Sequence, residues 1–325
     1  MNKIVFCGSI IADVIKTIPT WPEKGMLVPI TSIRRQIGGA VCNSGVDLKT
    51  LDPSIEVKAV GAVGDDDNGE FVIRYLEAKG IDCSLVRRVK GVPTSFTDVM
   101  TVESTGERTF FNMHGADSTL VPEDVDASRL DCDIFHFGYL LLLDGMDAPD
   151  EEYGTKAARL LAAVQAAGIK TSIDIVSEQS DRFARIVRPA LRYCDYCIVN
   201  EIEGSMATGA KADDLRGICE GLLEAGVREQ AVVHCPDAGV SLDRSGAFAR
   251  VGSLKLPDGW IKGSVGAGDA FCAGMLYSIM KGLDAEHSLR LASCAAAMNL
   301  TVPDSVSGAK SYDETFALDS KFARR

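Results

Sequence analysis

The sequence lacks several features that would each point to a particular class of protein. It has no run of eighteen apolar residues and no charged, apolar start of the kind found in signal peptides. It has no long basic segment, and 46 Asp and Glu residues outnumber 34 Lys and Arg residues, which gives a net charge of −12. Nucleic acid and anionic membranes are therefore unexpected partners. We expect a soluble, cytoplasmic protein that acts on small molecules.

Two common phosphate-binding motifs and a paired cysteine motif are also missing. No Gly-x-x-x-x-Gly-Lys-Ser/Thr segment occurs, so the chain is not a P-loop protein. Residues 8–13 do not form the Gly-x-Gly-x-x-Gly fingerprint of dinucleotide-binding proteins. Cys194 and Cys197 have a spacing seen in metal sites, but no second pair follows. We interpret the ten cysteines as small buried residues of a reducing compartment.

Strands and helices alternate along most of the 325 residues. Short apolar runs predict strands at 3–8, 57–63, 134–137, 170–175, 196–199, 231–234, 239–242 and 247–251. Helical spacing of apolar residues predicts helices at 38–51, 70–79, 155–167, 182–192, 213–225, 266–281 and 285–300. This alternation favours one α/β domain, in which a mostly parallel sheet lies between two layers of helices.

Two segments interrupt the alternation. Residues 13–35 contain prolines and short β-prone pieces, and residues 94–112 have the pattern of a β-hairpin. We expect these segments, at about 13–35 and 94–112, to pair into a small sheet that covers a ligand cleft as a lid. A small sheet with one exposed apolar face is a poor monomer surface, so we also expect a homodimer formed through the lid.

The most informative segment is the glycine-rich turn at residues 263–269. Small residues at 266–268 let backbone N–H groups approach a ligand, and the helix that follows adds the positive end of its dipole. The Asp269 carboxylate would repel a bound phosphate. Its presence in this turn is explained if it takes a proton from an attacking hydroxyl. The alternative is that Asp269 only caps the helix, since Asp is a preferred N-cap residue.

Three further segments carry polar residues next to predicted strands or helices. Gly38 and Gly39 begin a helix, and the Asn43 amide one turn later can bind hydroxyls. Asn200 and Glu203 follow a strand, where they could order waters around Mg²⁺ or simply form the first turn of a helix. Asp13 lies in an apolar stretch, so its charge requires a partner or a polar ligand, or else it is a structural carboxylate.

Taken in order, these segments resemble the ribokinase-like (PfkB) family of carbohydrate and nucleoside kinases over roughly residues 1–312. The matching features are Asp13, the Gly38-Gly39 pair with Asn43, residues 63–66, the hairpin, Asn200 with Glu203, and Gly266-Ala267-Gly268-Asp269. The resemblance implies a ribokinase-like three-layer α/β/α fold with a small β-sheet lid. It also implies an ATP-dependent phosphotransferase that uses Mg²⁺ and acts on an alcohol group.

The resemblance also implies roles for individual residues. Asp269 looks like the base, and the amides of Gly266, Ala267 and Gly268 look like the anion hole for the transferred phosphoryl group. The residues that resemble the acceptor-binding set are Asp13, Gly38, Gly39, Asn43 and, more weakly, Arg108. Those that resemble the set for ATP and Mg²⁺ are Asn200, Glu203 (bound to the metal through water), Gly239 and Asn299.

Two departures from the family pattern leave questions open. The family turn usually begins with Asp-Thr, where this chain has Gly263-Ser264, so activation by a monovalent cation such as K⁺ is in doubt. Pro236 and Asp237 alter the usual glycine-rich stretch before the adenine pocket. The acceptor is open between a sugar (ribose, fructose or a 2-keto-3-deoxy sugar acid) and a nucleoside, and a binding protein without turnover is a further alternative. A sugar acid would require nearby cations, for which the candidates are Arg34, Arg35 and Arg108.

Overall fold

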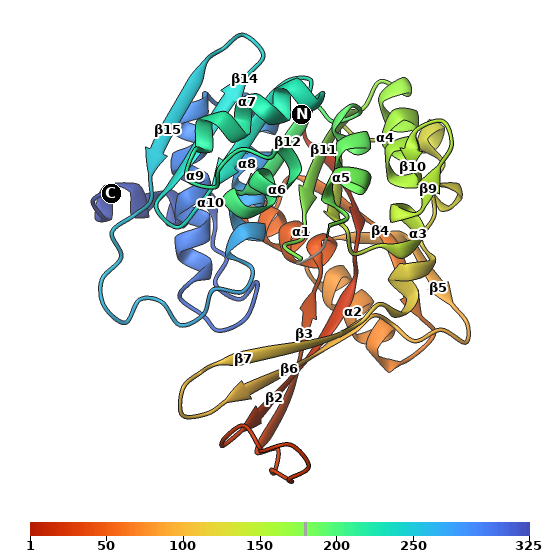
Figure 1. The fold of residues 1–325 in the computed structure, drawn as a ribbon. Coiled ribbons are helices and arrows are strands. Elements are labelled where there is room, and N and C mark those ends of the chain that lie inside the picture. The colour runs from red at the N-terminus through yellow and green to blue at the C-terminus, as the bar shows by residue number, and fades with distance from the viewer. Residues whose placement is uncertain (179–180) are drawn as a thin grey trace.

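A nine-stranded, mostly parallel sheet forms the centre of the molecule (Figure 1). The computed structural model describes residues 1–178 and 181–325. The strands, in their order across the sheet, are β15 (Phe248–Gly252), β14 (Ala238–Asp243), β13 (Gln230–His234), β12 (Tyr196–Asn200), β11 (Lys170–Ile175), β8 (Ile134–Leu140), β1 (Lys3–Gly8), β4 (Glu56–Gly64) and β5 (Asp82–Val89). Among the described strands of this sheet, β14 alone runs opposite to the others, since its pairings with β13 and β15 are antiparallel. The predicted α/β class is confirmed.

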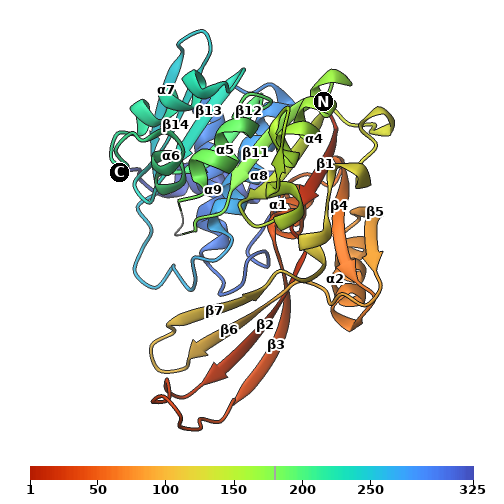
Figure 2. The same cartoon turned by 45° about the vertical axis from the view of Figure 1, so that its right-hand side comes forward.

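Helices cover both faces of this sheet (Figures 1 and 2). One face carries α1 (Ala40–Leu51), α2 (Asp67–Ala78), α8 (Ala267–Lys281), α9 (Ala285–Asn299) and α10 (Tyr312–Lys321). The other carries α3 (Asp144–Asp147), α4 (Lys156–Ala166), α5 (Phe183–Leu191), α6 (Glu201–Thr208) and α7 (Leu215–Ala225). Because helices pack on both faces of the sheet, its central strands must carry apolar side chains on both faces, as β1 does. Phe6 packs in the cluster that contains Met275 of α8, whereas Cys7 packs in the cluster that contains Leu160 of α4.

A four-stranded sheet projects from one side of this domain (Figures 1 and 2). Its order is β3 (Ser32–Gly38), β2 (Ile11–Ile18), β6 (Phe96–Val102) and β7 (Arg108–Met113). The pairing of β2 with β6 is parallel, and the two outer pairings are antiparallel. Lys16 and Asp98 form an ion pair of 2.6 Å across the parallel pair. The two interrupting segments of the sequence thus lie side by side in one small sheet.

Short elements complete the chain between β7 and α4. They are the 3-10 turns η1 (Gly115–Thr119), η2 (Pro122–Asp124) and η3 (Ala127–Arg129), and the two-residue strands β9 (Pro149–Asp150) and β10 (Gly154–Thr155). Ten free cysteines are present, most of them buried. Within residues 1–178 and 181–325, no helix has the length and apolar character needed to cross a membrane.

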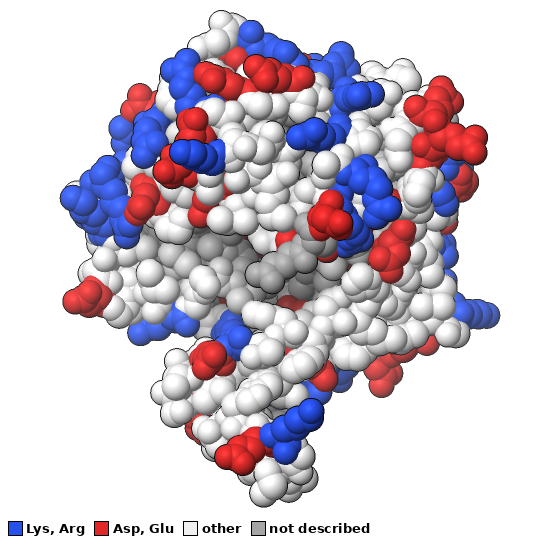
Figure 3. All heavy atoms as spheres, viewed as in Figure 1, with Lys and Arg blue, Asp and Glu red and all other residues white. Residues whose placement is uncertain are grey.

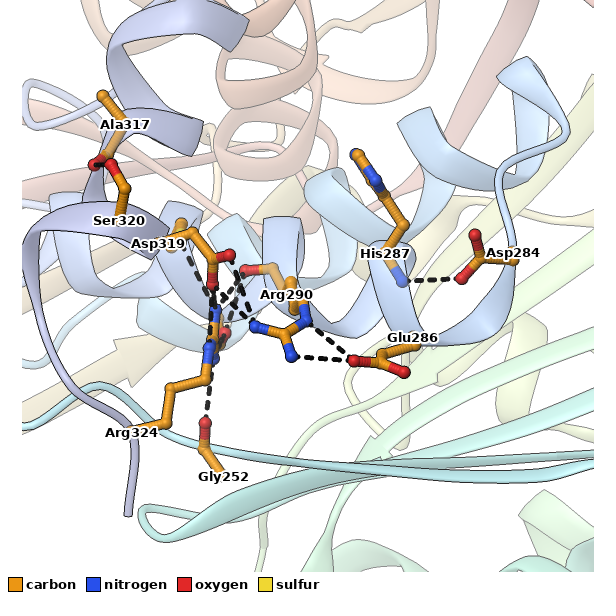
Figure 4. Close-up of polar contacts among 11 residues, drawn as sticks. Gly252, Asp284, Glu286, His287, Arg290, Ala317, Asp319, Ser320 and Arg324 are labelled. Atoms are coloured by element: carbon orange, nitrogen blue, oxygen red, sulfur yellow. Dashed lines mark hydrogen bonds and ion pairs between the residues drawn. The ribbon is translucent and has the colours of Figure 1, made fainter.

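The C-terminal tail is tied to the domain by charged side chains (Figure 4). Arg324 Nε donates to Asp319 Oδ1 at 2.8 Å, and Arg324 Nη1 donates to the Gly252 carbonyl at 2.8 Å. Arg290 of α9 bridges the same Asp319, at 3.4 Å, and Glu286, at 2.7 Å. Asp319 therefore joins α10, α9 and the tail at one point.

Candidate active site

A cavity of about 260 Å³ lies where the carboxyl ends of central strands meet the start of α8. The residues that line it are Tyr139, Asp174, Ile175, Val176, Ser177, Ile198, Asn200, Glu203, His234, Gly266, Gly268, Asp269 and Cys272. Ligands of open α/β sheets bind at this end of the strands. Figure 3 shows a hollow in the surface between the small sheet and the larger domain. The predicted glycine-rich turn and the Asn200 segment therefore share one cavity.

The glycine-rich turn has the conformation that an anion-binding site requires. Gly266 is the N-cap of α8 with φ of 81°, and a Cβ there would collide with the Ser305 backbone. Gly268 faces the cavity, where the nearest atom to an added Cβ is on the His234 ring at 3.7 Å. The first amides of a helix lack intrahelical acceptors and lie at the positive end of its dipole. Ala267 does not line the cavity, and its N–H donates to the Ser264 carbonyl at 3.3 Å.

Asp269 points its carboxylate into this cavity from the first turn of α8. Tyr139 Oη donates to it at 2.9 Å, and Asn43 Nδ2 donates to Oδ2 at 3.0 Å. Burial raises the pKa of Asp269 to about 7, the charge of Asp174 adds to the rise, and the two hydrogen bonds oppose it. A carboxylate that titrates near neutral pH is suited to accept and return a proton. The interpretation of Asp269 as the N-cap is wrong, because Gly266 occupies that position.

Tyr139 and Asp174 line the cavity, and the sequence did not indicate either of them. Tyr139 has φ of 63°, in the left-handed region that non-glycine residues rarely adopt. Its N–H donates to Asp174 Oδ1 at 2.6 Å, and His136 Nε2 lies 3.4 Å from Asp174 Oδ2. One signal could have identified Asp174, since it is a carboxylate at the carboxyl end of a predicted parallel strand. No local pattern marks Tyr139.

Asn200 and Glu203 form a capping box at the start of α6, and both also line the cavity. Asn200 Oδ1 accepts from the Glu203 N–H at 2.8 Å, and Glu203 Oε2 accepts from the Asn200 N–H at 2.9 Å. Ser177 Oγ donates to Glu203 Oε1 at 2.7 Å. Burial raises the pKa of Glu203 to about 8, against the hydrogen bonds from Asn200 and Ser177. The two interpretations of this segment are therefore compatible, because the helix cap also fixes a carboxylate beside the cavity.

The Gly38-Gly39 turn brings Asp13 and Asn43 toward the same region. A Cβ on Gly38 would lie 2.6 Å from Asp13 Oδ2, and Gly39 has φ of 87° and leaves no room for a Cβ beside the Ser9 carbonyl. Both positions therefore require glycine. Burial raises the pKa of Asp13 to about 7, while Thr97 and Arg108 lower it. Asn43 Oδ1 is buried and has no hydrogen-bond partner among the described residues, so it can accept from a ligand hydroxyl.

The other predicted residues, like Asp13, Gly38, Gly39 and Asn43, do not line the main cavity. Arg108 donates to the Pro303 carbonyl at 2.6 Å and lines neighbouring cavities instead. A Cβ on Gly239 would lie 3.1 Å from the Phe271 ring, so this glycine makes room for core packing. Asn299 Nδ2 donates to the Ser305 carbonyl at 2.5 Å, and Ser305 in turn abuts Gly266. Contact of Gly239 and Asn299 with a nucleotide stays a prediction.

Comparison with known proteins identifies the family. The family profile of pfkB family carbohydrate kinases matches residues 1–311. The chain belongs to this family. The predicted family is thus confirmed, and with it the class of enzyme, an ATP-dependent carbohydrate kinase.

Curated relatives and solved structures of the kinase family cover almost the whole chain. An ATP-dependent ribose-1-phosphate kinase of Halopiger xanaduensis is 26% identical over 307 residues, which is 92% of each chain. A ribokinase of Arabidopsis thaliana is 25% identical over 309 residues, which is 93% of this chain and 77% of the relative. The crystal structure of a ribokinase from Thermotoga maritima superposes with a TM-score of 0.82 at 19% identity, and covers 99% of this chain and 100% of that one. The ribokinase-like fold is confirmed.

Proposed function

We propose that this kinase transfers the γ-phosphoryl group of ATP to a hydroxyl of a small sugar or related polyol, with Asp269 as the general base. The observation that carries the proposal is the position of the Asp269 carboxylate. It is buried at the start of α8, next to Gly266 and Gly268, with a pKa of about 7. A base and an anion-binding turn on adjacent residues bring together the two groups that phosphoryl transfer needs.

In the proposed reaction, the Asp269 carboxylate and the backbone amides of the glycine-rich turn have different roles. The acceptor hydroxyl gives its proton to Asp269, its oxygen forms a bond to the γ-phosphorus, and the bond to the leaving ADP oxygen breaks. Gly266 and Gly268 line the cavity, where their backbone amides would stabilise the charge on the transferred group. Tyr139 Oη already donates to Asp269 at 2.9 Å, in the way an acceptor hydroxyl would. The phenol therefore either shares the carboxylate with the acceptor or moves when the acceptor binds.

The chemistry of the cavity also fits Mg²⁺, which binds oxygen ligands and retains several waters. Asp174 and Glu203 both line the cavity, and the Asn200 amide is bonded to Glu203. Glu203 already accepts hydrogen bonds on both carboxylate oxygens, which favours contact with the metal through water. When bound, Mg²⁺ would neutralise phosphate charge. Asp174 is the additional residue that we propose for this group.

We propose that the small sheet acts as a lid over the acceptor. Asp13 comes from its strand β2 and Arg108 from its strand β7, and both line the cavity next to Val265. Arg108 reaches across to Pro303 of the larger domain. A sheet that contributes acceptor-binding groups would exclude water when it closes.

A homodimer through this lid is a further part of the proposal. Large apolar side chains of the small sheet and its connection are exposed, among them Trp21, Leu27, Ile30, Ile33, Phe110, Phe111 and Met113. Leu27 is 96% exposed, and the ring of Trp21 stacks on Phe111 with centroids 6.3 Å apart. Exposed apolar surface of this kind is typical of an interface. Sedimentation that shows only monomer at micromolar concentrations would exclude the dimer.

The test of the activity is release of ADP from ATP and Mg²⁺ in the presence of a panel of sugars and nucleosides. We expect acceptor-dependent release that Asp269→Asn slows by a factor of roughly 10² to 10⁴ while nucleotide binding is retained. Melting temperatures that rise with ligands, without ADP release for any acceptor, would instead indicate a binding protein.

We also propose a cytoplasmic location, where ATP is supplied and the ten cysteines stay as free thiols.

A further inference from the structure

A second cavity of about 400 Å³ lies between the small sheet and the loop that precedes α8. Three basic residues line it: Arg34 from β3, Arg108 from β7 and Lys262 from the loop. None of the described residues that line it is acidic. Figure 3 shows basic side chains where the small sheet meets the larger domain. A basic cavity is unexpected in a chain with a net charge of −12.

These three cations have no anionic partner in the part of the chain that the structure describes. Arg108 makes its hydrogen bond to a neutral group, the Pro303 carbonyl. Burial lowers the pKa of Arg108, and the charge of Arg34 lowers it further, while Asp304 and Asp13 raise it from a longer range than an ion pair. Like charges held close together cost free energy that a bound anion would offset.

The basic cavity continues into the proposed acceptor site. A smaller neighbouring cavity is lined by Asp13, Gln36, Asp304 and Ser305. Both cavities share Ile15, Arg108, Phe110, Val265 and Pro303. Arg108 therefore lies between a compartment with carboxylates, which suit sugar hydroxyls, and a compartment with cations only. A ligand that reaches both would have hydroxyls at one end and an anionic group at the other.

We propose that the acceptor is an anionic sugar, and that Arg34, Arg108 and Lys262 bind its anionic group. The three cations favour a phosphate monoester over a carboxylate. A phosphate monoester carries a charge of about −1.5 to −2 and three acceptor oxygens, and guanidinium groups bind such oxygens in pairs. This proposal depends on the proposed function, because it specifies the acceptor of the same reaction.

The chain offers a matched control in the residue next to Arg34. Successive side chains of a strand point to opposite faces, so Arg35 of β3 faces away from the basic cavity. Its guanidinium lies 5.6 Å from the centroid of the Phe71 ring, in a groove that Glu70 also lines. Arg34→Gln and Arg35→Gln therefore remove the same charge from neighbouring positions, but only the first removes it from the cavity.

The experiment compares a neutral sugar with sugar phosphates and a sugar acid as acceptors. ADP release is measured with ribose, ribose 1-phosphate, ribose 5-phosphate and 2-keto-3-deoxygluconate, for the wild type and for the Arg34→Gln, Lys262→Gln and Arg35→Gln variants. We expect a phosphorylated ribose to exceed ribose in kcat/KM by about 100-fold or more, given what charge-assisted hydrogen bonds contribute. Arg34→Gln and Lys262→Gln should each raise KM for it about 10-fold, and added salt should raise it further. Arg35→Gln should leave KM unchanged.

Several outcomes would overturn the proposal. A preference for neutral ribose would do so, as would equal losses on ribose and ribose phosphates in the Arg34→Gln variant. A preference for 2-keto-3-deoxygluconate would retain the anionic site but reject phosphate as its ligand. If none of the acceptors leads to ADP release, the proposed function fails. Calorimetric binding of the same sugars then tests the anionic-sugar site independently of turnover. Binding of a ribose phosphate that Arg34→Gln weakens and Arg35→Gln does not would retain the site, and no binding of any anionic sugar would reject it.

Discussion

Replacing Asp269 by asparagine should have opposite effects on activity and on stability. The substitution keeps the size of the side chain but removes the group that takes the acceptor proton. Loss of a general base lowers turnover by a factor of roughly 10² to 10⁴, which corresponds to about 3–5 kcal/mol of transition-state free energy. The pKa of about 7 also predicts that wild-type kcat/KM falls as the pH drops below 7, because the base becomes protonated.

The stability effect follows from the direction of the same pKa change. The folded-state pKa of about 7 is higher than the ordinary value of 3.8, so the folded protein binds this proton more tightly than the unfolded chain. The contribution to stability is then fully present below pH 4 and is lost as the pH rises toward 7. About three pH units at 1.36 kcal/mol each give an upper limit of about 4 kcal/mol. The amide that replaces the carboxylate has no charge to bury, so Asp269→Asn should be the more stable protein at pH 8.

Urea unfolding of the wild type and Asp269→Asn at pH 5 and pH 8 measures this difference. The variant should gain stability over the wild type at pH 8, with a smaller gain at pH 5. Asp13 is present in both proteins and its pKa change does not depend on Asp269, so its contribution cancels in the comparison. Glu203 loses the neighbouring charge of Asp269 in the variant, which adds to the expected gain at pH 8. Asp258→Asn, on an exposed loop, is the control and should change neither stability nor turnover. A variant that is no more stable than the wild type at pH 8, or that keeps wild-type turnover, would refute the reasoning.

Further predictions concern three other residues, Tyr139, Gly263 and Asp319. Tyr139→Phe removes a hydrogen bond that lowers the pKa of Asp269, so the acid limb of the kcat/KM profile should move to higher pH. The wild type should be equally active in KCl and NaCl, because Gly263 replaces the family aspartate. The Gly263→Asp variant should lose about 1–3 kcal/mol of stability in urea unfolding, since the new Cβ would lie 2.9 Å from Pro303 Cα. Asp319→Ala breaks contacts with two arginines and should cost about 1–2 kcal/mol in urea unfolding, with turnover per folded molecule unchanged.

The elements of the main sheet were predictable because their patterns are local. Strand β1 is apolar on both faces, and β11 was predicted at its observed bounds, since buried parallel strands are continuous apolar runs. Strand β5 was missed because it lies at the sheet edge, is largely exposed and carries Arg87 and Arg88. Helix α6, with eight residues, is too short to show an apolar period, and α10 packs mainly through Thr315 and Leu318.

The glycines of the candidate site were predictable for the same reason, because a sharp turn before a helix is a local feature. The partners of Asp269 were not, since its contacts come from distant parts of the chain. Tyr139 lies 130 residues away in sequence, and Asn43 lies 226 residues away. The choice between Arg34 and Arg35 likewise depended on the register of β3, which a segment with prolines and mixed polarity does not specify.

Energetically costly features of the fold concentrate around the main cavity. Tyr139 and Leu141 both have positive φ, and they are the only described non-glycine residues that do. Asp174, Glu203 and Asp269 are buried carboxylates in one cavity, where the charge of Asp174 raises the pKa of both Glu203 and Asp269. Selection for stability alone would remove such strain and such charges. Their presence around one cavity is explained if the carboxylates bind cations that arrive with ATP and accept a proton from the acceptor. The same argument predicts that the Asp269→Asn variant is more stable and inactive, because the buried charge that costs stability is also the proposed base.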